Sequence, residues 1–130
     1  MNDVSIEYNG RYIHIVTSSK FAINPEEQTK LWNEIAKSCK ENSCLKVFHE
    51  GPSPIRKMTT VDSFESGVMA SEVVPGLRLA VFFPEYPADE ITQFFKTVAF
   101  NRGVTVEFFT DRSEALRWLG VEENSTENKS

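Results

Sequence analysis

Apolar and polar residues alternate at the start of the chain, as they do in β-strands that bury one face. Residues 4–8 alternate in this way, and residues 12–16 do so again. Between these two segments stands Asn9-Gly10, a pair typical of a two-residue hairpin turn. The pattern therefore predicts an N-terminal β-hairpin.

After the hairpin, the apolar residues recur at the spacing of a helix. Asn24 and Pro25 are typical of the cap and first position of a helix, and Glu27 gives this start a capping-box-like arrangement. We expect the helix to end near residue 42 or 43, before a short strand over 45–49. Its predicted apolar face consists of Leu31, Trp32, Ile35 and Cys39.

The rest of the folded region alternates between helices and strands. The apolar run over 77–83, broken only by Arg78, is typical of a strand that is buried on both faces. The complete order is β-β-α-β-α-β-α-β-α, which predicts an α/β fold with a mixed, mostly parallel sheet and an N-terminal hairpin. The other predicted segments are a helix from Thr59 or Thr60 with Phe64, Val68 and Met69 on its buried side, a helix from 88 to Gly103, a strand over 104–108, and a helix between Asp111 and Gly120.

The length and composition of the chain fit one domain. Its 130 residues, of which 40% are apolar, are enough to bury a sizeable core. Residues 121–130 are polar and charged and show no periodicity. We expect residues 1–120 to form a single domain and residues 121–130 to form a disordered polar tail.

Charge and hydropathy narrow the range of partners. The net charge of −5 argues against non-specific nucleic-acid binding, which needs a basic surface. The apolar runs are only as long as strands, so we expect no membrane insertion. The first residues do not resemble a signal peptide, which predicts a cytoplasmic location. In that compartment Cys39 and Cys44 are expected to be packing residues, not a disulfide or a metal site.

Sequence motifs for catalysis are missing. The chain contains neither Gly-x-Gly-x-x-Gly nor a Gly-Lys-Ser/Thr phosphate loop, and we predict no cofactor, no metal and no catalytic residue. One enzymatic alternative uses His49 as base, Glu50 as its orienting group and Ser53 as nucleophile. Because adjacent residues of a strand point to opposite faces, His49 and Glu50 are not expected to form a dyad.

The longest irregular stretch, residues 50–60, follows a strand end, where open α/β sheets bind ligands. Basic residues before a helix start favour an anion site or a phosphorylated hydroxyl, whereas the commoner role of a threonine there is to cap the helix. The candidate loop for a ligand or partner contains His49, Glu50, Ser53, Arg56, Lys57, Thr59, Thr60 and Ser63.

The helix predicted from residue 88 is rich in phenylalanine. Phe94, Phe95 and Phe100 do not fit easily on one core-facing side, so we expect Phe95 or Phe100 to reach the surface. An exposed aromatic patch is typical of a protein contact. Ordinary core packing of these rings is the alternative.

Several segments together resemble the SpoIIAA-like, STAS-related bacterial proteins of unknown function. They are 97–103 (TVAFNRG), 109–111 (FTD) and 115–119 (ALRWL), together with a first helix that begins at 24–27 (NPEE). The resemblance covers about residues 3–120. It implies a STAS-type α/β fold with a central mixed sheet and helices packed against it.

The better-known relatives in that group are anti-sigma-factor antagonists, which bind protein partners and are switched by phosphorylation of a serine at the start of the second helix. The comparable region here is 51–63, and the Asp-Ser-Ser-Gly-like motif is missing, since Asp62-Ser63 is followed by Phe64-Glu65. The resemblance implies a non-catalytic protein-interaction or regulatory module with a protein partner, a homodimer being one option. The alternative is a domain that binds a small molecule or lipid.

Overall fold

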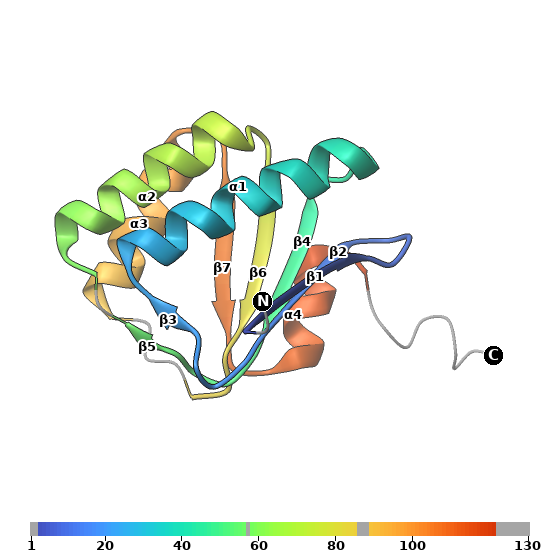
Figure 1. Cartoon of the computed structure of the whole chain (residues 1–130), viewed down its shortest axis with the longest axis horizontal. Coiled ribbons are helices and arrows are strands. Elements are labelled where there is room, and N and C mark those ends of the chain that lie inside the picture. Colours follow the sequence, from blue (N-terminus) through green and yellow to red (C-terminus); the bar gives the residue numbers. More distant parts are fainter. Residues whose placement is uncertain (1–2, 57, 86–88, 122–130) are drawn as a thin grey trace.

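The computed structural model describes residues 3–56, 58–85 and 89–121. They form a five-stranded sheet in the order β1-β2-β4-β6-β7, in which β1 is antiparallel to β2 and the other neighbours are parallel (Figure 1). The strands are β1 (Val4–Tyr8), β2 (Ile13–Thr17), β4 (Lys46–Glu50), β6 (Arg78–Phe82) and β7 (Thr105–Phe109). The predicted α/β class and sheet type are confirmed.

Helices cover both faces of the sheet. Three of them, α1 (Pro25–Asn42), α2 (Thr60–Val73) and α3 (Glu90–Asn101), lie on one face, and α4 (Arg112–Leu119) packs on β4, β6 and β7 from the other (Figure 1). The predicted order of helices and main strands is confirmed. One feature is additional: the short strands β3 (Ala22–Ile23) and β5 (Ile55–Arg56) pair in parallel as a separate ribbon.

The first helix follows its local sequence signals closely. Asn24 Oδ1 accepts a hydrogen bond from the backbone N–H of Glu27 at 2.9 Å, which satisfies one of the free donors at the helix start. The helix ends at Asn42, and Ser43 caps it in a left-handed conformation. The four residues buried on α1 are the four expected, Leu31, Trp32, Ile35 and Cys39.

The N-terminal hairpin is present, but its turn is longer than predicted. Tyr8 pairs with Ile13, so residues 9–12 form the connection. The side chain of Asn9 accepts hydrogen bonds from the backbone N–H groups of Arg11 and Tyr12, each at 3.0 Å. These bonds stabilise a four-residue loop, and the expectation of a two-residue turn at Asn9-Gly10 was wrong.

The buried side of α2 also differs from the prediction. Phe64 is 42% exposed and Val68 is half-buried, whereas Met69 is half-buried and packs against the apolar core as predicted. The fully buried positions are Ser63, Ser66, Gly67 and Ala70. The reason is a close crossing with α3, because a Cβ atom at Gly67 would lie 2.8 Å from Cγ1 of Val98. Small side chains allow the two helices to approach, and the larger phenylalanine lies outside the contact.

Two apolar cores lie on the two faces of the sheet. The larger one fills the space between the sheet and helices α1–α3, and the smaller one lies beneath α4. Val121, at the start of the predicted tail, is 7% exposed and belongs to the smaller core, whereas residues 122–130 lie outside the described part of the chain. No helix among the described residues is long and apolar enough to cross a membrane.

Candidate functional site

His49 and Glu50 are neighbours on β4 and point to opposite faces of the sheet. His49 faces helices α1–α3, where its ring contacts the rings of Phe21 and Phe83 edge-on, with centroids 5.8 and 5.0 Å away. Glu50 faces α4 and binds Arg112. The alternation of the strand therefore keeps the two side chains apart, and they serve two separate sites.

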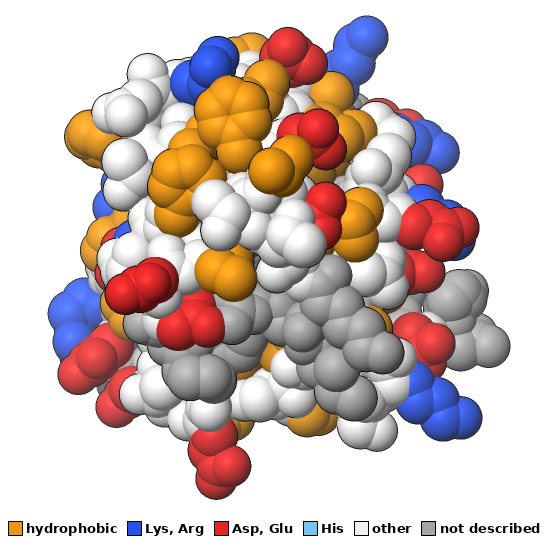
Figure 2. All heavy atoms as spheres, turned by 90° about the vertical axis from the view of Figure 1, so that its left-hand side faces the viewer, with side chains coloured by type: hydrophobic (Ala, Val, Ile, Leu, Met, Phe, Trp, Pro, Cys, Tyr) orange, Lys and Arg blue, Asp and Glu red, His pale blue; other side chains and the backbone are white. Residues whose placement is uncertain are grey.

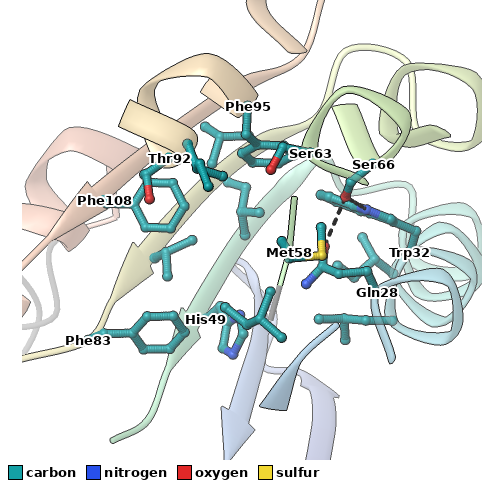
Figure 3. Close-up of a pocket in the computed structure, with 17 residues that line it drawn as sticks. Gln28, Trp32, His49, Met58, Ser63, Ser66, Phe83, Thr92, Phe95 and Phe108 are labelled. Atoms are coloured by element: carbon teal, nitrogen blue, oxygen red, sulfur yellow. Dashed lines mark hydrogen bonds between the residues drawn. The ribbon is translucent and has the colours of Figure 1, made fainter. Parts of the chain in front are cut away.

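A cavity of about 70 Å³ lies between the sheet and helices α1, α2 and α3, beside His49 (Figure 3). Strands β4, β6 and β7 supply one wall, the three helices supply most of the rest, and Ile23 of β3 and Met58 complete the lining. All seventeen described residues that line it are uncharged, and twelve of them are apolar. The five polar lining residues are Gln28, His49, Ser63, Ser66 and Thr92.

A chain of hydrogen bonds joins the α1 and α2 walls of this cavity. The indole N–H of Trp32 donates to Ser66 Oγ at 2.8 Å, and the Ser66 hydroxyl donates to Gln28 Oε1 at 3.0 Å. Figure 3 shows both bonds at one side of the cavity. The Ser66 hydroxyl is therefore used both as donor and as acceptor, so these polar groups are satisfied within an otherwise apolar wall.

His49 is the buried titratable group of the cavity. It is 5% exposed, and its Nε2 lies 3.2 Å from Oγ1 of Thr17. Burial lowers the pKa of His49 to about 4; Glu50 opposes this shift by raising it, and His14 adds to the lowering. The imidazole is neutral near pH 7, and its Nδ1 has no hydrogen-bond partner among the described residues.

Gly51 allows Thr17 to lie against this histidine. A Cβ atom at position 51 would stand 2.4 Å from Thr17 Oγ1 and 2.6 Å from its carbonyl oxygen. No side chain fits in that space, so the chain passes β2 closely as it leaves β4. The sequence alone indicates only that Gly51 belongs to the irregular stretch over 50–60.

On the opposite face, Glu50 holds the start of α4. Its carboxylate accepts from Arg112 Nε at 2.9 Å and Nη2 at 3.2 Å, and it lies 2.6 Å from His14 Nε2. Burial alone would raise the pKa of Glu50, but the hydrogen bonds from Arg112 and His14 outweigh it and lower the pKa. His14 stacks on Phe48, and Arg112 lies over the same ring. The contacts of this cluster join the sheet to the start of α4.

The other predicted loop residues do not converge on one site. Thr59 caps α2 in a capping box, exchanging hydrogen bonds of 3.0 and 3.1 Å with Asp62. Ser53 Oγ accepts from the backbone N–H of Glu85. Ser63 lines the cavity and is 2% exposed. Of the remaining candidates, Thr60 is the exposed first residue of α2, Arg56 belongs to β5, and Lys57 lies outside the described residues.

Most of the cavity wall was not foreseen as a site. From the sequence, Trp32 is expected in the core and Phe95 in the core or at the surface, and neither Gln28 nor Ser66 belongs to the predicted candidate loop. A signal does exist in the sequence, because Ser63 and Ser66 share the buried side of α2 at a spacing of three residues. Buried hydroxyls on an otherwise core-facing side indicate a polar partner or a cavity.

Neither a cluster of metal-binding side chains nor an activated Cys39 thiol is present in the described part of the chain. No group of three or more His, Cys, Asp or Glu side chains comes together there. Burial, with a smaller contribution from Cys44, raises the pKa of Cys39 to about 11, so this thiol is protonated near neutral pH. Both cysteines are free.

The fold and the cavity define an α/β domain with an internal apolar site. A solved structure of an uncharacterised protein of the DUF3478 family from Shewanella loihica, described as having a SpoIIAA-like fold, is similar to it. The TM-score is 0.46 and the sequence identity 17%, over 89% of this chain and 91% of that chain. No protein-family model matches the chain, and no curated protein matches it.

Proposed function

We propose that this protein is a non-catalytic binding domain that holds a small apolar molecule in the cavity beside His49. The observation that carries the proposal is the composition of the wall, in which apolar side chains surround a few uncharged polar groups. Binding sites for small molecules have this character, with apolar walls and a small number of polar groups that orient the ligand.

The state of the polar groups supports binding over catalysis. A general base works best when its pKa lies near the working pH, and the pKa of His49 is about 4. The hydroxyl of Ser66 is already engaged with Trp32 and Gln28, so it is not poised as a nucleophile. These features favour a wall that recognises a ligand without transforming it.

The size of the cavity limits what it encloses. Its volume of about 70 Å³ is roughly half that of an apolar cavity known to hold benzene, which measures about 150 Å³. A ring the size of toluene therefore enters only if side chains of the wall move, and we expect such a shift on binding. A side chain that grows into this space is expected to exclude the ligand.

Filling the cavity from the sheet is expected to abolish binding of an apolar probe. Val81 is 4% exposed, pairs with His49 in the sheet and lines the cavity, so Val81→Phe places a ring in the ligand's space. Toluene, titrated by NMR on the indole N–H signal of Trp32, should bind the unmodified domain and bind this variant at least about tenfold more weakly.

Val16→Phe is the matched control, because Val16 lies on the same sheet but is 41% exposed and does not line the cavity. Its affinity for toluene should stay within about twofold of the original. Equal binding of toluene by the folded Val81→Phe variant would show that the cavity is not the site.

A protein-interaction role is a second candidate, favoured by exposed aromatic side chains on α2 and α3. Phe100 is 68% exposed, Phe64 42% and Phe94 38%. Of the two phenylalanines, Phe95 and Phe100, of which one was expected at the surface, Phe100 is the exposed one. Figure 2 shows hydrophobic side chains gathered on the side formed by these helices. Under this candidate the partner is another protein or a second copy of the chain. If the partner is a second copy, light scattering should detect a dimer that Phe64→Ser and Phe100→Ser dissociate.

A further inference from the structure

The wall of the cavity discriminates by charge. None of the described lining residues is Lys, Arg, Asp or Glu, so a carboxylate or an ammonium group that enters the cavity loses its hydration without gaining an opposite charge. His49 does not supply a positive charge, because it is neutral near pH 7. An uncharged ligand avoids this cost entirely.

The wall also offers hydrogen bonds that the protein does not use. Nδ1 of His49 and Oγ of Ser63 have no hydrogen-bond partner among the described residues, and both residues line the cavity. They belong to different walls, β4 and α2, and Figure 3 shows them on separate sides of the space. His49 is held in place through Thr17, which occupies its other nitrogen.

A hydroxyl group matches this arrangement. The neutral imidazole places either a donor or an acceptor at Nδ1, depending on its tautomer, and a hydroxyl oxygen both donates and accepts. A hydrocarbon of the same shape leaves Nδ1 without a partner. A carboxylate matches only the donor form and carries the charge that the wall does not balance.

We propose that the cavity selects an uncharged, mostly apolar molecule that carries a hydroxyl group, and that this hydroxyl forms a hydrogen bond with Nδ1 of His49. This inference rests on the proposed function, because it names the class of ligand for the same cavity. His49 is thus the residue that determines specificity, and the surrounding aliphatic and aromatic side chains supply the apolar contact.

Matched ligands test separately whether the cavity binds small apolar molecules and whether it prefers an uncharged molecule with a hydroxyl group. Benzyl alcohol, toluene and benzoate share a ring and differ in hydroxyl and charge, and 1-butanol and butyrate form a smaller pair. Each is titrated into the isotope-labelled protein while the indole N–H signals are followed. Trp32 is the reporter in the wall, and Trp118 is the internal control, because it packs on Arg78 and Phe109 at the opposite face.

We expect each alcohol to bind at least about a hundredfold more tightly than its carboxylate, and benzyl alcohol to bind about fivefold to tenfold more tightly than toluene. His49→Phe should remove the advantage of benzyl alcohol over toluene, and the indole N–H signals of Trp32 and Trp118 show whether the variant is folded. His49→Gln, which keeps a hydrogen-bonding group, should restore part of the advantage.

Three outcomes contradict the account at different levels. If none of the five compounds shifts the Trp32 signal, the proposed function itself is wrong. If toluene binds but benzoate binds as tightly as benzyl alcohol, the cavity is a binding site and the inferred ligand class is wrong. If Ser63→Ala removes the advantage of benzyl alcohol while His49→Phe does not, the hydroxyl is bound by Ser63 and the assignment to His49 is wrong.

Discussion

Acidification from pH 7 to pH 4 is expected to cost the domain about 3 kcal/mol of stability, because protonation of His49 favours the unfolded chain. The ordinary pKa of this histidine, 6.5, falls to about 4 in the folded protein. Between these values the unfolded chain binds more protons than the folded one, so stability decreases as the pH falls. A difference of about 2.5 pKa units corresponds to roughly 3 kcal/mol, which is fully present only above pH 6.5.

Protonation of Glu50 should cause a further loss of stability at lower pH. Its folded pKa lies below the ordinary 4.5, so its contribution is present above that value and decreases as the pH falls through the folded pKa. Urea unfolding at a series of pH values between 7.5 and 3 measures the His49 part above pH 4 and the Glu50 part below pH 4.5. His49→Phe should flatten the curve between pH 6.5 and 4.5, whereas a free energy of unfolding that is constant from pH 7 to pH 5 in the original protein would contradict the burial of a neutral His49.

Replacement of Gly67 by leucine is expected to prevent stable folding, at a cost of about 4 kcal/mol or more. A Cβ atom at this position would lie 2.8 Å from Val98 Cγ1 and 3.3 Å from the backbone nitrogen of Ala99. A longer side chain has no room at this crossing, so α2 and α3 would have to separate. Because both helices wall the cavity, the site would be lost together with the packing.

A smaller change at the same position provides the control. In Gly67→Ala, the added methyl group contacts mainly the Val98 side chain. The higher helix propensity of alanine stabilises α2 by about 1 kcal/mol and offsets part of this cost. We expect a net loss of about 1 kcal/mol, and Val98→Ala in the same chain should relieve the contact. Chemical denaturation of the single and double variants gives the coupling free energy between positions 67 and 98. Wild-type stability in Gly67→Leu would mean that the two helices do not approach so closely.

The parts of the fold that could be predicted depend on local chemistry. Asn24 and Thr59 cap their helices through bonds to backbone groups three residues away, and Gly120 ends α4 in a left-handed conformation. Alternation along a strand likewise placed His49 and Glu50 on opposite faces. None of these features needs information about distant parts of the chain.

The features that escaped prediction depend on contacts between distant segments. Phe64 is apolar, but a close crossing with α3 gives the inner side of α2 to Gly67 and its small neighbours. The partner of Glu50 is Arg112, 62 residues away, which no local pattern indicates. The cavity also escaped prediction, because the helices and strands that line it come from distant parts of the sequence. Sequence reasoning found His49 and Ser63 but placed them in a loop site.

The most direct test of the binding site is a crystal structure of the protein with benzyl alcohol. The account predicts the ring between the sheet and helices α1–α3, near Trp32 and Phe108, with the hydroxyl oxygen about 3 Å from Nδ1 of His49. Benzyl alcohol bound only at the exposed Phe64 and Phe100, with an empty cavity beside His49, would contradict it.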